Sequence, residues 1–127
     1  MENTSLANDD ELPAMDPLAL ERLRRFGGGK LLSEMIALFL AAAPERIGAA
    51  RTAVDASNVS AAEMALHSLK SSSAQLGAMR MQRLSERGEL IARAGTLDGV
   101  AGVVADLEDE LPRVQTWLQQ ATTPETA

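Results

Sequence analysis

Apolar residues recur at every third or fourth position along most of this chain, which is the period of an α-helix that buries one face. In the first long stripe the spacings are 3, 4, 4, 4, 3 and 4. No segment shows the strict alternation of a half-buried strand. The members of this first stripe are Leu32, Met35, Phe39, Ala43, Ile47, Ala50 and Val54. The four long helices that these patterns predict cover residues 31–54, 58–76, 79–94 and 97–120.

A shorter helix precedes these four and has clear boundary signals. Asp16 is suited to cap its first turn, Pro17 suits the first helical position, and glycines 27–29 form a stop. Two prolines fall inside the long helices, and we expect a bend or break at Pro44 and an interruption at Pro112. The positions expected to face inward in the short helix are Leu20, Leu23 and Phe26.

Short links between long amphipathic helices make consecutive helices antiparallel neighbours. The predicted fold is therefore all-α, an antiparallel up-down-up-down four-helix bundle over residues 16–120 with a short N-terminal helix. Residues 1–15 are polar, acidic and aperiodic, so we expect a disordered N-terminal arm there. Residues 121–127 are expected to form a flexible tail.

Composition argues against several classes of function. Aromatic residues make up only 2% of the chain, so the core must be aliphatic, and the absence of cysteine excludes disulfides and cysteine-ligated zinc. The net charge of −6 argues against a nucleic-acid partner. The N-terminus lacks a signal-peptide pattern, and no apolar run approaches the roughly 18 residues of a membrane span. We therefore expect a cytoplasmic protein without a metal site.

The most informative chemistry lies at His67, the only histidine of the chain. It falls beside the apolar seam of its helix rather than in it, within a stripe that is polar or small throughout. Lys70, one turn later, is placed to lay its ammonium over the ring. Imidazole often carries or moves charge near neutral pH, although a histidine on an ordinary solvated face would show the same pattern. The members of this stripe are Glu63, His67, Lys70, Ser71 and Ala74.

The segment around His67 resembles the core motif of the histidine-containing phosphotransfer (HPt) domains of bacterial phosphorelays. In that family the histidine is followed by x-Leu-Lys-Gly, then small residues, then an apolar-Gly-Ala stop. Here residues 67–78 read His-Ser-Leu-Lys-Ser-Ser-Ser-Ala-Gln-Leu-Gly-Ala. The segments 16–23, 39–44 and 89–95 also resemble parts of the family, so the resemblance covers about residues 16–118.

The resemblance implies a phosphoryl carrier. In the family, the histidine Nε2 attacks the phospho-aspartate of one receiver domain and later gives the phosphoryl group to the aspartate of another. His67 would then be the phospho-acceptor, and Lys70 would balance the phosphoryl charge. Glu89 would hydrogen-bond Nδ1, fix the tautomer and leave Nε2 free. Without the family, Glu89 would be interpreted as an ordinary solvated helix charge.

The resemblance also implies which partners the chain has. These are response-regulator receiver domains, with a hybrid sensor kinase as a further candidate, and the chain itself would be a monomer. The divalent metal of the reaction would lie on the receiver, so this chain would need no cofactor and would have no catalytic activity of its own. The positions that we expect to contact a partner are Glu63, Ser71, Ala74, Gln75, Arg80 and Arg83.

Two features, Ser71 and a stripe of arginines, leave alternatives open. Ser71 replaces the family's glycine. The serine would supply a hydroxyl donor to the phosphoryl group, slow the approach of a receiver and mark a weaker carrier, or mark an interaction module that binds a receiver or kinase without carrying phosphoryl. Arg80, Arg83 and Arg87 share one helix face, and they would either meet an acidic rim of a receiver or form a simple solvated stripe. Gly88 would leave a thin spot in the core near Glu89. Four acidic residues are interpreted as a solvated face, namely Asp106, Glu108, Asp109 and Glu110.

Overall fold

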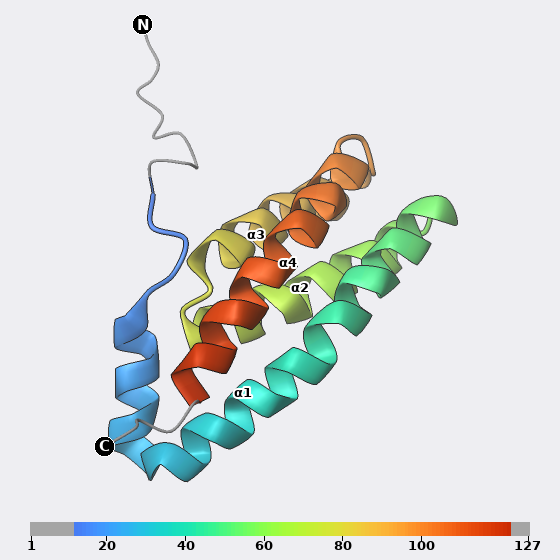
Figure 1. The fold of residues 1–127 in the computed structure, drawn as a ribbon. Helices are drawn as coiled ribbons and strands as arrows, with labels where there is room; N and C mark the ends of the chain where they lie inside the picture. Colours follow the sequence, from blue (N-terminus) through green and yellow to red (C-terminus); the bar gives the residue numbers. More distant parts are fainter. Residues whose placement is uncertain (1–11, 123–127) are drawn as a thin grey trace, which may run out of the picture.

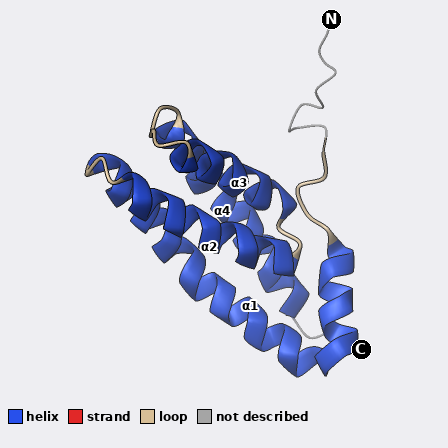
Figure 2. Cartoon of the chain, turned by 180° about the vertical axis from the view of Figure 1, so that it is seen from behind, coloured by secondary structure: helices blue, strands red, loops and turns tan. Residues whose placement is uncertain are grey.

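The computed structural model describes residues 12–122, and all regular structure in that range is helical. Four antiparallel helices form a bundle in which α2 and α4 each pack against both α1 and α3 (Figure 1). Figure 2 shows the same bundle from behind, with short loops joining the helices. The all-α four-helix bundle predicted from the sequence is confirmed. The helices are α1 (Pro17–Asp55), α2 (Val59–Leu76), α3 (Met79–Arg93) and α4 (Val100–Thr122).

The predicted short helix and the first long helix form one element, α1, which is kinked at Gly28. Gly28 has φ 77° and ψ −177°, a conformation that glycine adopts readily because it has no Cβ. Asp16 caps the helix by accepting a hydrogen bond from the backbone N–H of Leu18 at 3.0 Å, and Pro17 takes the first helical position. The first segment of α1 therefore leaves the kink at a sharp angle to the rest of the helix (Figure 1).

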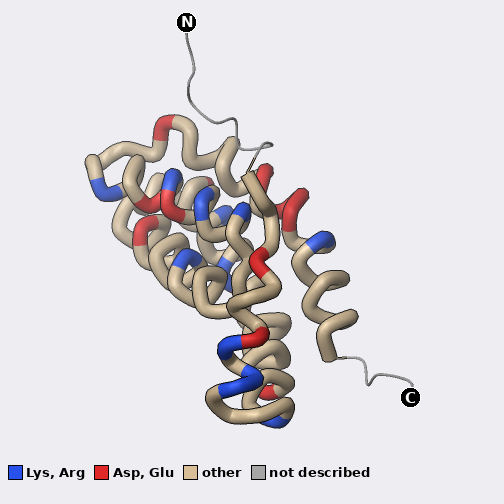
Figure 3. Tube along the Cα trace, turned by 90° about the vertical axis from the view of Figure 1, so that its left-hand side faces the viewer, with Lys and Arg blue, Asp and Glu red and all other residues tan. Residues whose placement is uncertain are grey.

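The prediction that Phe26 faces inward is wrong, because Phe26 is 88% exposed. Phe26 follows the buried Leu20 by six residues, which places it about 120° away around the helix axis. The basic residues near it are also exposed, and Figure 3 shows Lys and Arg gathered at the end of the molecule where α1 kinks. These basic residues are Arg22, Arg24, Arg25 and Lys30.

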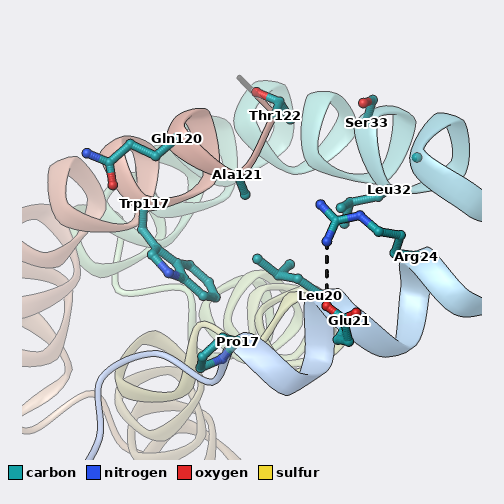
Figure 4. Close-up of a pocket in the computed structure, with 11 residues that line it drawn as sticks. Pro17, Leu20, Glu21, Arg24, Leu32, Ser33, Trp117, Gln120, Ala121 and Thr122 are labelled. Carbon is teal, nitrogen blue, oxygen red and sulfur yellow. Dashed lines mark ion pairs between the residues drawn. The ribbon is translucent and has the colours of Figure 1, made fainter. Parts of the chain in front are cut away.

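The kink leaves a cavity of about 730 Å³ between the first segment of α1 and the C-terminal end of α4 (Figure 4). Trp117 points into this space from α4, and Leu20 points into it from α1. Arg24 and Glu21 form an ion pair of 3.5 Å at its edge. Its lining comes from α1 and α4 and includes no residue of α2, the helix that carries His67. The cavity is therefore separate from the histidine.

The expected break at Pro44 and the expected interruption at Pro112 are wrong, whereas a bend at Pro44 stays a prediction. Gly28 is the residue of α1 with non-helical dihedrals, so the helix continues through Pro44, and α4 likewise runs through Pro112. Both prolines are exposed, so water can satisfy the carbonyl that each leaves without an N–H partner. Packing of the buried faces on either side keeps each helix continuous.

The core is aliphatic, as composition predicts. In α1 the buried positions include Ile36 and Ala53, while Met35 and Val54 from the predicted stripe are only half-buried. Gly88 leaves no thin spot, because a Cβ there would lie 2.8 Å from Leu66 Cδ1. The largest apolar side chains of the core are Leu32, Ile36, Leu66, Leu69, Leu76, Met81, Leu84, Leu107 and Leu118.

Residues 12–15, which the sequence assigns to the arm, pack against the bundle. The backbone N–H of Arg80 donates to the carbonyl of Ala14 at 3.1 Å, and the backbone N–H of Asp16 donates to the carbonyl of Gly77 at 2.8 Å. Met15 packs against the core. The ordered chain therefore begins before Asp16. The rest of the predicted arm, residues 1–11, and residues 123–127 of the predicted tail lie outside the described residues.

Glu110 does not belong to a solvated face, because it is only 1% exposed. Its Oε1 lies 3.6 Å from Nε of Arg80 and 3.3 Å from Nη1 of Arg113. These two arginines neutralise the carboxylate at the contact between α3 and α4, as a buried charge requires.

By length and composition α1 could cross a membrane, since its most apolar stretch has a mean hydropathy of 1.4. Such a helix is weak evidence for a membrane span, because core helices of soluble proteins pass the same test. Leu32, Ile36 and Phe39 of α1 pack into the bundle core. Only 22% of that stretch is buried in the bundle, so core packing accounts for part of the apolar composition of α1.

Candidate functional site

His67 lies at the middle of α2, on a helix with well-defined ends. Asn58 caps its N-terminus by accepting a hydrogen bond from the backbone N–H of Ala61 at 3.0 Å, and Gly77 ends it with φ 77°. The neighbouring Leu66 and Leu69 are fully buried, whereas the His67 side chain is 58% exposed. The predicted place of the imidazole, beside the core seam rather than in it, is confirmed.

Glu89 of α3 lies directly against this histidine. Its side chain is 0% exposed, and its Oε2 lies 2.7 Å from Nδ1 of His67. The other oxygen, Oε1, lies 2.7 Å from Nζ of Lys70. The interpretation of Glu89 as an ordinary solvated charge is wrong, because the packing of α2 on α3 encloses the carboxylate completely.

The charge state of Glu89 determines the tautomer of His67. Burial alone would raise the pKa of the Glu89 carboxyl, but the hydrogen bonds from Lys70 and His67 and their charges outweigh it and lower the pKa below its ordinary value of 4.5. An ionised carboxylate only accepts hydrogen bonds, so Nδ1 must carry a proton and donate it. In the neutral ring the lone pair is then on Nε2, on a side chain that is largely exposed.

Arg93 completes the group, and the sequence analysis did not identify it. Its Nη2 donates to Oε2 of Glu89 at 2.6 Å, and its Nε donates to Oε2 of Glu63 on α2 at 3.2 Å. The signal in the sequence was the four-residue spacing from Glu89 to Arg93, which places both on one helix face. Two carboxylates thus face two cations, Lys70 and Arg93, around one imidazole.

The spacing of Lys70 from His67 predicted that the ammonium lies over the imidazole ring, and this prediction is wrong. The ammonium instead pairs with Glu89, and the Lys70 side chain is 26% exposed. A carboxylate at 2.7 Å attracts an ammonium more strongly than a neutral ring does. The ammonium is therefore held one helical turn from the imidazole, with part of its surface still in water.

Three of the expected partner contacts lie on the outward surface of α2. Ser71, Ala74 and Gln75 are all exposed, and each follows His67 within about two helical turns. Ser71 and Ala74 are small, so the surface next to the imidazole is open. A fourth expected contact, Glu63, also lies on α2. It is half-buried and forms an ion pair with Arg93.

The structure does not bring Arg80 and Arg83 to the histidine. Arg80 pairs with Glu110 of α4, and Nη1 of Arg83 donates to the carbonyl of Pro13 at 3.1 Å. Both therefore point toward α4 and the N-terminal segment, while Glu89 lies on the side of α3 that meets α2. Within residues 12–122, no group of three or more His, Cys, Asp or Glu is arranged to hold a metal ion.

Comparison with known protein families shows to which family this domain belongs. The family model of the Hpt domain matches residues 34–117, a segment that contains His67, Lys70, Glu89 and Arg93. The chain belongs to the Hpt domain family. Hpt domains are phosphocarrier modules of phosphorelays, so this domain has a role in histidine phosphotransfer and signal transduction.

Two solved structures share the fold of this Hpt domain. The histidine-containing phosphotransfer protein B from Pseudomonas aeruginosa PAO1 superposes with a TM-score of 0.82 at 23% identity, over 87% of this chain and 95% of that one. The HPT domain of a sensor hybrid histidine kinase from Shewanella superposes with a TM-score of 0.72 at 22% identity, over 90% of this chain and 97% of that one. No curated protein matches the sequence significantly.

Proposed function

We propose that this Hpt domain accepts a phosphoryl group on Nε2 of His67 from the aspartyl phosphate of one receiver domain and passes it to the aspartate of another. The observation that carries this proposal is the hydrogen bond of 2.7 Å between Nδ1 of His67 and the buried Glu89. It fixes one ring nitrogen as a donor, which leaves Nε2 as the nucleophile on an exposed side chain.

The chemistry balances with the groups that are present. The Nε2 lone pair attacks phosphorus, the bond from phosphorus to the aspartate oxygen breaks, and the aspartate leaves as a carboxylate. Because Nδ1 keeps its proton, the phosphorylated ring is an imidazolium, and the negative charge of Glu89 stabilises it more than the neutral ring. Stabilisation of the positive charge that develops on the ring lowers the barrier to phosphorylation of His67. The divalent metal of the reaction belongs to the receiver in this proposal.

Lys70 and Arg93 neutralise different negative groups during transfer. Lys70 lies one turn from His67 and turns its ammonium from Glu89 toward the incoming phosphoryl oxygens. Arg93, at 2.6 Å from Oε2, remains on Glu89 and keeps that buried carboxylate neutralised while Lys70 is away. Two cations are therefore needed where one would leave either the carboxylate or the phosphoryl group unpaired.

The surface around His67 supports a protein partner. Besides the small residues of α2, two large apolar side chains are each 69% exposed: Met64, one turn before His67 on α2, and Leu38 of α1, which lines a groove together with Gln75. Apolar side chains next to a reactive group are typical of a protein interface. We expect a receiver domain to cover them when it reaches Nε2, and the Hpt domain to act as a cytoplasmic monomer without binding nucleic acid or membrane.

The deciding experiment is intact mass spectrometry of the Hpt domain after incubation with phosphorylated receiver domains, next to a His67→Gln control. The expected result is a gain of one acid-labile phosphoryl group that the control lacks. A second receiver, added afterwards, should remove the group and become phosphorylated. A folded wild type that binds receivers but gains no mass would instead support the interaction module that Ser71 left open.

A further inference from the structure

Arg46 of α1 lines a groove of about 300 Å³ between α1 and α2. One wall of the groove is apolar and includes Leu38 and Ala42, and the other contains the polar side chains of Ser72 and Gln75. This groove is distinct from the cavity at the kink of α1, because α2 forms part of it.

Unlike Arg51, Arg93 and Arg113, Arg46 has no counter-ion among the residues that the structure describes. Arg51 lies 2.9 Å from Glu108, Arg93 lies 2.6 Å from Glu89, and Arg113 lies 3.3 Å from Glu110. Arg46 is half-buried, its Nε is shielded from solvent without a hydrogen-bond partner, and no carboxylate of residues 12–122 pairs with it. A guanidinium in this state lowers stability, since a shielded donor is left unsatisfied.

The groove is placed where a protein docked on His67 would reach it. Gln75 of its polar wall follows His67 by eight residues on the outward surface of α2, which is about 12 Å along the axis. The exposed Leu38 lies at the groove and extends the same surface onto α1. A partner wide enough to cover His67 and Ser71 therefore also covers the groove.

We propose that Arg46 is a specificity-determining anchor that binds a carboxylate of the receiver docked on His67. The planar guanidinium pairs with a carboxylate through two parallel hydrogen bonds, and the apolar stem of the acidic side chain packs on Leu38 and Ala42. Docking thus gives Arg46 the counter-ion that the free domain lacks. The inference rests on the proposed function, because it names the contact by which the same partner is recognised.

The distribution of charge along the chain explains why such an anchor matters. The chain has a net charge of −6, but five of its 18 acidic residues and none of its 12 basic residues lie outside residues 12–122, so the domain itself is nearly neutral and its overall field does not select a partner. A single positive group beside an apolar groove then selects partners that place a carboxylate opposite it, and it rejects partners that place a cation there. Arg46 would thus choose among receivers and fix their orientation, while His67 and its neighbours carry out the transfer.

The test is the kinetics of phosphoryl transfer from a phosphorylated receiver domain that loads the wild type. Arg46→Gln should raise KM about tenfold, as expected for a lost charged hydrogen bond, and leave kcat at saturating receiver unchanged. Arg46→Glu should raise KM further. Arg25→Gln is the matched control, because it removes the same charge from an exposed position of α1 on the other side of the Gly28 kink, and its KM should stay within about twofold.

Two further measurements make the result decisive. Thermal melting of Arg46→Gln should show a midpoint equal to or above that of the wild type, because the substitution removes an unpaired donor rather than a structural contact. Acidic residues of the receiver are then changed to Lys one at a time, and one such variant should regain transfer with Arg46→Glu. If a receiver phosphorylates the wild type and Arg46→Gln has the same KM, this inference alone is overturned. If no receiver phosphorylates the wild type, the proposed function is overturned together with it.

Discussion

Glu89, a fully buried carboxylate of α3, accepts a hydrogen bond of 2.7 Å from Nδ1 of the exposed His67 on α2. The two residues are 22 positions apart in the chain, so only the packing of α2 on α3 brings them together. One end of this pair is rigid because it is enclosed, and the other reaches solvent. The imidazole is thus oriented by the core of the bundle while its second nitrogen is available to a partner.

Glu89→Gln should slow the phosphorylation of His67 without preventing it. The amide keeps the shape of the side chain but removes the charge that stabilises the phosphorylated imidazolium. Loss of a charged hydrogen bond worth about 1.5–3 kcal/mol corresponds to a rate that is roughly tenfold to a hundredfold lower. Rapid-quench measurement of transfer from a phosphorylated receiver checks this value.

The matched control for that substitution is Glu108→Gln on α4. It removes the same charge from an exposed carboxylate whose partner is Arg51, and it should leave the transfer rate unchanged. If Glu89→Gln transferred as fast as Glu108→Gln, the buried carboxylate would have no part in the reaction.

Arg93→Gln should destabilise the domain more than Glu63→Gln, although both break the same ion pair of 3.2 Å. Arg93 also holds the buried Glu89, and we expect its removal to lower the free energy of unfolding by about 1.5 kcal/mol or more. Glu63 loses only a partly exposed pair, worth less than about 1 kcal/mol. Urea unfolding of both variants gives the two values, and equal losses would show that Arg93 contributes little to Glu89.

Stability should fall in acid because of Glu89. Its pKa is lowered in the folded state, so the folded protein binds fewer protons than the unfolded chain near the ordinary value of 4.5. The stabilisation is therefore complete above 4.5 and is lost as the pH falls from there through the lowered pKa. In urea unfolding across this range, the difference between wild type and Glu89→Gln should be largest near neutral pH and shrink in acid. A difference that stayed constant would mean that the carboxyl does not titrate differently on folding.

Local sequence patterns were sufficient to predict the helices and the position of His67 beside the core. Apolar spacing and end signals located four helices and the break at the glycines, and the polar stripe placed the histidine beside the core seam. The role of Glu89 was indicated only by the family resemblance, since a carboxylate in a sequence looks the same whether its helix face is enclosed or solvated. What encloses Glu89 is the packing of α3 on α2, together with cations from both helices.

The errors at Glu110 and at the two prolines share the same physical origin. Glu110 was assigned to a solvated face because its neighbours are acidic, yet Arg80 from another helix neutralises it. Pro44 and Pro112 were expected to disturb their helices on local grounds, but tertiary packing keeps both helices continuous. In each case the deciding contact lies far along the chain, where a single sequence gives no spacing to measure.

Gly77→Ala should destabilise the domain more than Gly95→Ala. Both glycines have positive φ, 77° and 95°, so each substitution incurs a backbone penalty of about 1–2 kcal/mol. A Cβ on Gly95 meets nothing within 4 Å, whereas one on Gly77 would clash with the backbone oxygen of Asp16 and lie 2.9 Å from Ala19 Cβ. Overpacking adds roughly 1–3 kcal/mol at Gly77. Similar unfolding free energies for the two variants would show that the contact between the first segment of α1 and the α2–α3 turn yields easily.

Ser71→Trp should block phosphorylation of His67 and leave the fold intact. Ser71 is exposed one turn after the histidine, so an indole there stands where a receiver must approach, while surface substitutions usually change the free energy of unfolding by no more than about 0.5 kcal/mol. Ala105→Trp, at an exposed position of α4, is the control and should be phosphorylated like the wild type. Intact mass after incubation with a phosphorylated receiver, together with thermal melting, separates the two effects. If Ser71→Trp were phosphorylated at the wild-type rate, the receiver would have to reach Nε2 from another direction, and the outward surface of α2 would not be the docking surface.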